Sequence, residues 1–283
     1  MKLSVNLNKI ALLRNARGEN YPQIEYFANK AIDLGVDGLT LHPRPDHRHA
    51  TSDDAINISK LTKARGVEFN IEGNPFSKPN KEFIGFCELT EIIKPEQITL
   101  VPDSIDQITS DHGWSSGSHD SELKNLILLL KENSNDAQIS LFIDNIEGVD
   151  YAAEMGANLI EIHTGAFAKA INDENLSIIE ELKKIIDHAI SLNLKINAGH
   201  DLNLNNLHYL VEMGNINEVS IGHAIVVDSL HYGFEETISK YLEPYGSVFR
   251  KGQQYRAYQI GCGYIYSPIL YVGPRSGAHF LLP

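Results

Sequence analysis

The sequence is poor in cysteine. Its 283 residues include two, Cys87 and Cys262, which lie far apart and form no Cys-x-x-Cys pair. A disulfide framework or a thiolate zinc site needs more cysteines at closer spacing. We therefore expect two reduced thiols, and we exclude a fold that depends on disulfides.

Positive charge and long apolar runs are also scarce. Lysine and arginine number 24 against 37 acidic residues, so the formal net charge is −13. A protein that binds the phosphate backbone of a nucleic acid usually carries positive charge instead. Apolar runs such as residues 126–130 are far shorter than the roughly 20 residues that span a bilayer. The first eight residues turn polar too early for a signal peptide. We expect a cytoplasmic protein that binds neither nucleic acid nor membrane.

What the chain does contain is a repeated pattern, in which a short β-branched or alternating segment precedes a segment of helical period. The predicted strands are Leu3–Leu7, Gly38–Leu41, Glu68–Glu72, Gln97–Val101, Gln138–Ile143, Leu159–His163, Lys195–Asn197 and Glu218–Ile221. The predicted helices are Tyr21–Leu34, Asp53–Lys63, Lys81–Ile93, Glu122–Glu132, Glu147–Met155, Leu176–Leu192, Leu204–Met213 and Ala224–Tyr241. Eight such units in about 245 residues match a single closed (β/α)8 TIM barrel. A doubly wound open sheet is the other α/β arrangement, but no Gly-x-Gly-x-x-Gly follows the first strand.

The pattern divides the chain into two parts. We expect residues 1–245 to form the barrel as one catalytic domain, and residues 246–283 to form a C-terminal extension of unknown structure. From about Arg250 the sequence mixes tyrosines with scattered glycine and proline. This composition fits a packed extension, an oligomer contact or a non-native read-through sequence, and its aromatic residues argue against complete disorder.

Polar residues follow nearly every predicted strand. Active sites of TIM barrels lie at the carboxyl ends of the strands. The residues found there are Asn6, Asn8 and Lys9, then His42 and Arg44, Glu72, Asp103, Asp144, Glu161 and His163, His200, and His223. A single histidine at such a position is usually structural, but four histidines together with carboxylates at one barrel mouth indicate catalysis by proton transfer.

The arginines indicate where an anion binds. Arg14, Arg17, Arg44, Arg48 and Arg65 all precede residue 66, and the next arginine is Arg250. Guanidinium groups suit phosphate, so we expect a phosphate over the first two strands, held by Arg17 and Arg44, with Arg14 and Arg65 at surface helix positions.

A second anion site is predicted after the last strand. There Gly222 and His223 precede a helix whose free N–H groups can receive a phosphate. Two anion sites with acids and bases between them suggest that two phosphorylated small molecules are joined or rearranged.

Six segments occur in order along the chain: Asn15-Ala16-Arg17-Gly18, His42-Pro43-Arg44 with His49, Asn70-Ile71-Glu72-Gly73, Glu161-Ile162-His163-Thr164, Asn197-Ala198-Gly199-His200 and Ile221-Gly222-His223-Ala224. Together they make the sequence from about Leu3 to Tyr241 resemble the pyridoxine 5′-phosphate synthase family. The resemblance implies condensation of 1-deoxy-D-xylulose 5-phosphate with 3-amino-2-oxopropyl phosphate to pyridoxine 5′-phosphate, phosphate and water. It also implies catalysis without a metal or organic cofactor, in a homo-oligomer that is an octamer.

The resemblance also implies roles for individual residues. His42 and Glu72 match the family's proton acceptors, His200 its proton donor, and Glu161 the carboxylate that stabilises the transition state. The positions that match substrate contacts are Arg44, His49 and Thr109 for deoxyxylulose phosphate, and Asn6, Arg17, Gly222 and His223 for the amino-ketone phosphate.

Two positions depart from the family pattern. Asn8-Lys9 stands where some members have Asp-His, and Asp201 stands where other members have glycine. We expect Asn8, Lys9 and Asp201 to remain near the substrates. Lys9 could hold a substrate oxygen, and Asp201 could orient a neighbouring base or cap the next helix.

Three other functions fit parts of the pattern. A metal-dependent barrel hydrolase or aldolase could use the histidines with Glu72 and Asp144 as ligands, although the first strand ends in Asn-x-Asn instead of His-x-His. A Schiff-base aldolase would need a lysine on the sixth strand, which has none. A non-catalytic sugar-phosphate-binding barrel would use the arginines and glycines but would have no need of His42, Glu72 and His200 together.

Overall fold

The computed structural model describes residues 1–104, 106–107, 109–246, 255–260 and 263–268. Its centre is a closed barrel of parallel strands that pair in sequence order, with the first strand beside both the second and the last. The strands are β1 (Lys2–Asn6), β2 (Gly38–Leu41), β3 (Glu68–Gly73), β4 (Gln97–Leu100), β5 (Gln138–Ile143), β6 (Leu159–His163), β7 (Lys195–Gly199) and β8 (Glu218–Ile221). The predicted (β/α)8 barrel is confirmed.

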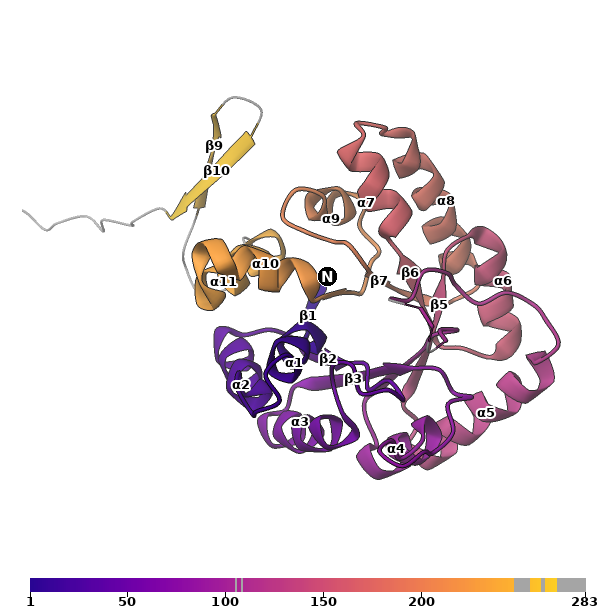
Figure 1. Cartoon of the computed structure of the whole chain (residues 1–283). Coiled ribbons are helices and arrows are strands. Elements are labelled where there is room, and N and C mark those ends of the chain that lie inside the picture. The colour runs from indigo at the N-terminus through magenta and orange to yellow at the C-terminus, as the bar shows by residue number, and fades with distance from the viewer. Residues whose placement is uncertain (105, 108, 247–254, 261–262, 269–283) are drawn as a thin grey trace, which may run out of the picture.

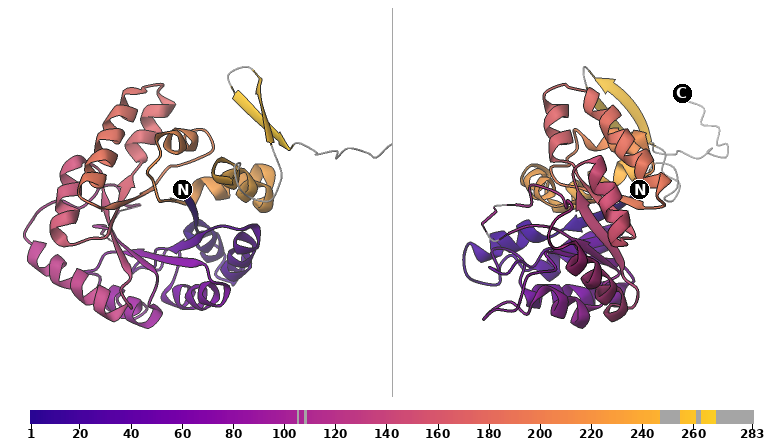
Figure 2. Two further views of the ribbon diagram at one scale, coloured as in Figure 1. Left: turned by 180° about the vertical axis from the view of Figure 1, so that it is seen from behind. Right: turned by 90° about the vertical axis from the view of Figure 1, so that its right-hand side faces the viewer.

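The helices surround this barrel (Figures 1 and 2). They are α1 (Asn8–Asn15), α2 (Ile24–Leu34), α3 (Ser52–Arg65), α4 (Phe86–Ile93), α5 (Asp120–Asn133), α6 (Ile146–Met155), α7 (Gly165–Asn172), α8 (Ser177–Ser191), α9 (Leu207–Met213), α10 (His223–Tyr232) and α11 (Phe234–Gly246). Each long helix buries an apolar stripe, as α8 does with Leu182, Ile186 and Ala189. The apolar core therefore lies between the barrel strands and the helices that surround them.

The helix predicted over Lys81–Ile93 begins only at Phe86, and the set of helices differs from the predicted one in three further places. Two helices that the periodicity did not predict, α1 and α7, directly follow β1 and β6. The predicted helix 224–241 is two helices, because Gly233 interrupts it with φ 78°. Both added helices belong to connections at the carboxyl ends of strands, which is the end where a TIM barrel carries its site.

The inside of the barrel is polar. Alternate strand residues such as Leu3 and Val5 are buried in the apolar core, while the residues between them carry polar side chains. Hydrogen bonds join Ser4 to Thr40 (2.7 Å), Asn70 to Thr99 (3.1 Å) and Gln97 to Asn197 (3.1 Å). Most TIM barrels fill this space with branched apolar side chains. The buried polar groups here continue to the carboxyl ends of the strands, where the candidate site lies.

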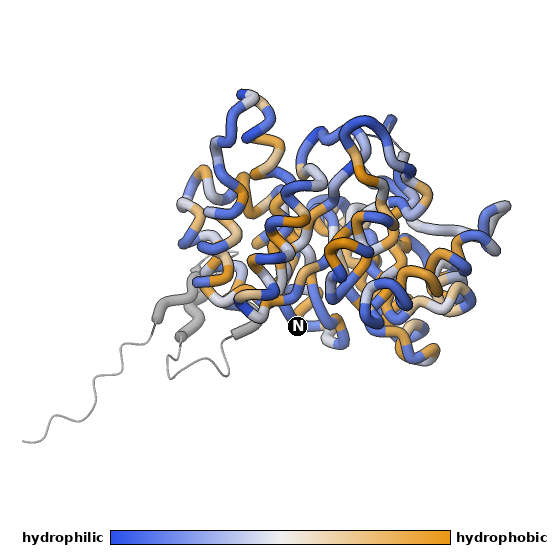
Figure 3. The backbone as a smooth tube through the Cα atoms, turned by 90° about the horizontal axis from the view of Figure 1, so that it is seen from below, coloured by the Kyte–Doolittle hydropathy of each residue, from blue (hydrophilic) through white to orange (hydrophobic). Residues whose placement is uncertain are grey.

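Outside the barrel, the structure describes an antiparallel pair, β9 (Tyr255–Ile260) and β10 (Gly263–Pro268). The rest of the predicted extension after residue 246 lies outside the described residues. In the described part of the chain, no helix is long and apolar enough to cross a membrane. Hydrophilic and hydrophobic stretches alternate along the backbone, as expected for helices that each bury one face (Figure 3).

Candidate active site

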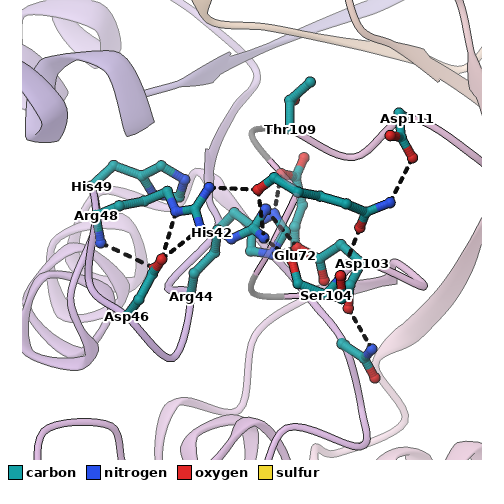
Figure 4. Close-up of polar contacts among 12 residues, drawn as sticks. His42, Arg44, Asp46, Arg48, His49, Glu72, Asp103, Ser104, Thr109 and Asp111 are labelled. Atoms are coloured by element: carbon teal, nitrogen blue, oxygen red, sulfur yellow. Dashed lines mark hydrogen bonds and ion pairs between the residues drawn. The ribbon is translucent and has the colours of Figure 1, made fainter.

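His42, Glu72 and a third residue, Asp103, meet at the carboxyl ends of β2, β3 and β4 (Figure 4). His42 Nδ1 lies 3.8 Å from Glu72 Oε2, and His42 Nε2 lies 3.3 Å from Asp103 Oδ2. Asn6 Nδ2 donates a hydrogen bond to Glu72 Oε2 (3.3 Å). All three of the titratable side chains are buried. The structure therefore brings together the two expected proton acceptors and adds a carboxylate to them.

Glu72 has an environment suited to proton transfer. Burial, followed by the charge of Asp103, raises the pKa of Glu72 to about 7, while hydrogen bonds from Asn6 and Ser220 act in the opposite direction. A group with a pKa near the working pH can both take and return a proton. Glu72 is thus placed and tuned as an acid–base group.

Glu161 lies deeper in the barrel. Burial and the nearby Glu72 raise the pKa of Glu161 well above its ordinary value, opposed by a hydrogen bond from Thr99 Oγ1 (3.4 Å). A Cβ atom at Gly199 would lie 2.3 Å from Glu161 Oε1. The glycine of β7 therefore makes room for a carboxyl group whose raised pKa favours the protonated form, which can donate a hydrogen bond.

His200 follows β7 on the other side of the mouth. Its Nε2 lies 3.0 Å from Thr109 Oγ1, and its ring makes an edge contact with His163 at 4.9 Å between centroids. Burial, and then the charges of His163, His42 and Lys9, lower the pKa of His200 to about 3. His200 is therefore neutral without substrate. A bound phosphate would favour its charged form, which is the form that a proton donor needs.

Arg44 is buried and already has partners. Its Nη1 lies 2.8 Å from Asp103 Oδ2, and its Nη2 donates to the carbonyl oxygens of Ser104 and, at 3.2 Å, Gln107. Arg48 Nη1 donates to the same Gln107 carbonyl (2.5 Å). The two arginines thus hold the segment that follows β4 against the segment that follows β2.

His49 lies beside this arginine pair. Its ring is 6.0 Å from that of His42 between centroids, and its Nδ1 accepts a hydrogen bond from the backbone N–H of Ala50 (3.0 Å). Burial, followed by the charges of His42, Arg44 and Lys9, lowers the pKa of His49 to about 3. A neutral His49 can still donate its Nε2 hydrogen to a substrate oxygen.

The expected contacts of the second substrate surround β1 and β8. Asn8 Oδ1 accepts from the backbone N–H of His42 (2.9 Å), so Asn8 fixes the backbone of that residue. Lys9 is the second residue of α1, and its charge acts on both His49 and His200. Arg17 is exposed just beyond α1.

Gly222 and His223 form the start of α10. A Cβ atom at Gly222 would lie 2.8 Å from the backbone oxygen of Asn6, so β1 and the start of the helix approach too closely for a side chain at this position. Exposed His223 is the first residue of the helix, and no side chain caps its N-terminus. An uncapped helix N-terminus can receive an anion, and the second anion site stays a prediction.

Sequence reasoning missed one functional candidate and misread another. Asp103 was recognised as a polar strand-end residue but was given no role. Asp201 does not cap α9, because Asn206 is the N-cap residue of that helix; the capping interpretation is wrong. The charge of Asp201 instead acts on His163, partly offsetting the effect of burial, which lowers the pKa of that histidine.

Among the described residues, no group of three histidine, cysteine, aspartate or glutamate side chains is placed to hold a metal ion. The metal-dependent alternative therefore has no candidate ligand set in this part of the chain.

Comparison with solved structures shows the fold. The structure of thiamine phosphate pyrophosphorylase from Pyrococcus furiosus superposes with a TM-score of 0.53 at 14% identity, over 87% of this chain and 97% of that one. A structure titled native KDPGal gives a TM-score of 0.55 at 12% identity, over 87% and 94%. At such identities the likeness concerns the barrel alone.

Comparison with sequences shows the family. The family model described as pyridoxal phosphate biosynthesis protein PdxJ matches residues 3–246. The pyridoxine 5′-phosphate synthase of Xylella fastidiosa (strain 9a5c) is 43% identical over 250 residues, covering 87% of this chain and 95% of the relative. That of Cytophaga hutchinsonii is 44% identical over 243 residues, covering 85% and 97%. The chain belongs to the PdxJ family of pyridoxine 5′-phosphate synthases.

Proposed function

We propose that this chain condenses 1-deoxy-D-xylulose 5-phosphate with 3-amino-2-oxopropyl phosphate to form pyridoxine 5′-phosphate, phosphate and water. The observation that carries the proposal is the buried acid–base set at the barrel mouth, where Glu72, with a pKa of about 7, lies beside His42. A barrel that only bound sugar phosphates would gain nothing from burying these groups together.

The proposed division of roles is the one that the family resemblance implies, and the positions of the side chains support it. Amine addition to a ketone, loss of water, elimination of phosphate and ring closure each move protons. His42 and Glu72 remove protons from the joined substrates on one side of the mouth. His200 returns a proton from the other side, and protonated Glu161 donates a hydrogen bond to an oxygen that gains negative charge.

The two phosphates are proposed to bind on separate sides. Arg44, His49 and Thr109 receive the phosphate of deoxyxylulose phosphate. Asn6, Arg17, Gly222 and His223 receive that of the amino-ketone, with the N-terminus of α10 supplying backbone N–H groups. Lys9 and Asp201 are proposed to contact substrate oxygens. The enzyme acts in the cytoplasm and uses neither metal nor organic cofactor.

The proposed reaction is tested with purified protein that has been treated with a chelator. Both phosphorylated substrates are added, and pyridoxine 5′-phosphate and released phosphate are measured in the same samples. We expect the product to form without added metal and phosphate to be released with it. Absence of product from a folded sample that binds deoxyxylulose phosphate would instead support the non-catalytic binder.

We also propose that the chain forms a homo-oligomer, an octamer as the family resemblance implies. The subunits are proposed to contact each other through apolar side chains of α1 and α10. Leu12 and Leu13 of α1 are 42% and 49% exposed, and Leu230 of α10 is 81% exposed. The two helices contact each other, and exposed apolar side chains on neighbouring helices suit a contact between subunits.

We expect light scattering to give a mass several times the 31.5 kDa of one chain. Leu230→Asp should lower that mass, because it places a charge in the contact. Leu176→Asp, at an exposed leucine before α8, serves as the control and should leave the mass unchanged. A native mass of one chain would contradict the proposal.

A further inference from the structure

Asp103 is the buried charge for which the family resemblance gives no role. It follows β4, and its carboxylate lies between the His42 ring and the Arg44 guanidinium (Figure 4). Asn74 Nδ2 donates to the backbone oxygen of Asp103 (2.8 Å), which fixes the backbone at this point. Both the backbone and the side chain of Asp103 are thus held in place.

The charge on Asp103 sets the hydrogen on the histidine ring. Burial would raise the pKa of Asp103, but the contacts with His42 and Arg44 outweigh it and bring the pKa below its ordinary value. An ionised carboxylate accepts hydrogen bonds and cannot donate them. The facing Nε2 of His42 therefore carries the hydrogen, and the lone pair is on Nδ1, toward Glu72.

We propose that Asp103 is a positioning residue for the condensation: it fixes the tautomer and direction of the His42 ring, stabilises the imidazolium that forms when Nδ1 takes a proton, and joins this base to Arg44 of the phosphate site. The inference rests on the proposed function. The arrangement has the same logic as the buried aspartate that orients the histidine of a serine protease.

A purely structural role gives different expectations. If Asp103 only anchored Arg44 and the segment after β4, its loss would weaken substrate binding and raise KM. If it positions His42, its loss lowers kcat and changes the tautomer of the ring. These outcomes separate the two roles.

The test compares Asp103→Asn, which keeps the shape and removes the charge, with Asp103→Glu, which keeps the charge. We expect Asp103→Asn to lower kcat about 30-fold, with KM for deoxyxylulose phosphate within threefold, because base catalysis by a correctly held group contributes roughly 10²- to 10⁴-fold. Asp103→Glu should recover part of the lost kcat. Asp46→Asn is the matched control, since Asp46 pairs with Arg48 (2.6 Å) in the neighbouring segment; its kcat should stay within twofold.

Nitrogen-15 NMR of the ring gives the second measurement. The native protein should show His42 with its hydrogen on Nε2, assigned by comparison with His42→Gln, and Asp103→Asn should add the Nδ1–H form. Native kcat in Asp103→Asn, or a native ring with the hydrogen on Nδ1, would overturn the inference. The NMR result on the native protein decides the question even if the variant does not fold. Failure of the native protein to form product would instead count against the proposed function.

Discussion

Replacing Glu72 by glutamine is expected to lower kcat by about 10³-fold while the affinity for deoxyxylulose phosphate stays within about tenfold. The amide has nearly the shape of the carboxyl group and can still bond to Asn6. It cannot take the proton that the ionised carboxylate takes, and the pKa of about 7 makes this exchange available near neutral pH. The loss should therefore appear in turnover and not in binding of an anion.

Steady-state kinetics and calorimetric titration of deoxyxylulose phosphate measure the two quantities. Glu68→Gln is the matched control, because Glu68 begins the same strand at the opposite end of the barrel and pairs with Lys2 (2.8 Å). Its kcat should stay within twofold. A Glu72→Gln variant with native turnover would remove Glu72 from the reaction.

The barrel could be predicted from the sequence because its signal is local. Each strand is a short apolar or alternating segment followed by a helix-period segment, and strand count then fixes the architecture. The strand-end rule predicts that His42, Glu72, Glu161 and His200 lie at one mouth. The short helix α1 was missed because it has no long apolar period, so its existence depends on tertiary contacts more than on local pattern.

The pairing of side chains within the mouth could not be predicted in this way. Every strand end carries a polar residue, and the pattern does not say which of them touch. Arg44 shows the consequence: the sequence indicated an anion site, whereas the structure shows a guanidinium that also holds Asp103 and two backbone carbonyls. A substrate phosphate at Arg44 would therefore bind beside these partners, because they already occupy Nη1 and Nη2 of the guanidinium.

The polar barrel interior has a consequence for stability. Glu218 is buried, and burial, followed by the charge of Glu68, raises its pKa well above the ordinary value, while Lys2 acts in the opposite direction. In the unfolded chain its carboxyl ionises near pH 4.3. Below that pH the group is protonated in both states and costs nothing. Above about pH 4.3 the unfolded chain releases this proton, whereas the folded protein keeps it because of the raised pKa. The stability contributed by the protonated group is therefore lost as pH rises toward the folded pKa.

The glutamine side chain does not ionise, so Glu218→Gln should be more stable than the native protein at alkaline pH. The difference in free energy of unfolding should grow by about 1.4 kcal/mol for each pH unit above about 4.3, until the folded pKa is reached. Urea unfolding from about pH 5 to about pH 9 measures this difference.

Burial lowers the pKa of His49 and His200 and so destabilises the fold in acid, but both proteins share this effect and it cancels in the difference. Glu236→Gln, at an exposed position of α11, is the control and should run parallel to the native curve. A constant difference between Glu218→Gln and the native protein would mean that Glu218 ionises alike in both states, and that the barrel interior tolerates its charge.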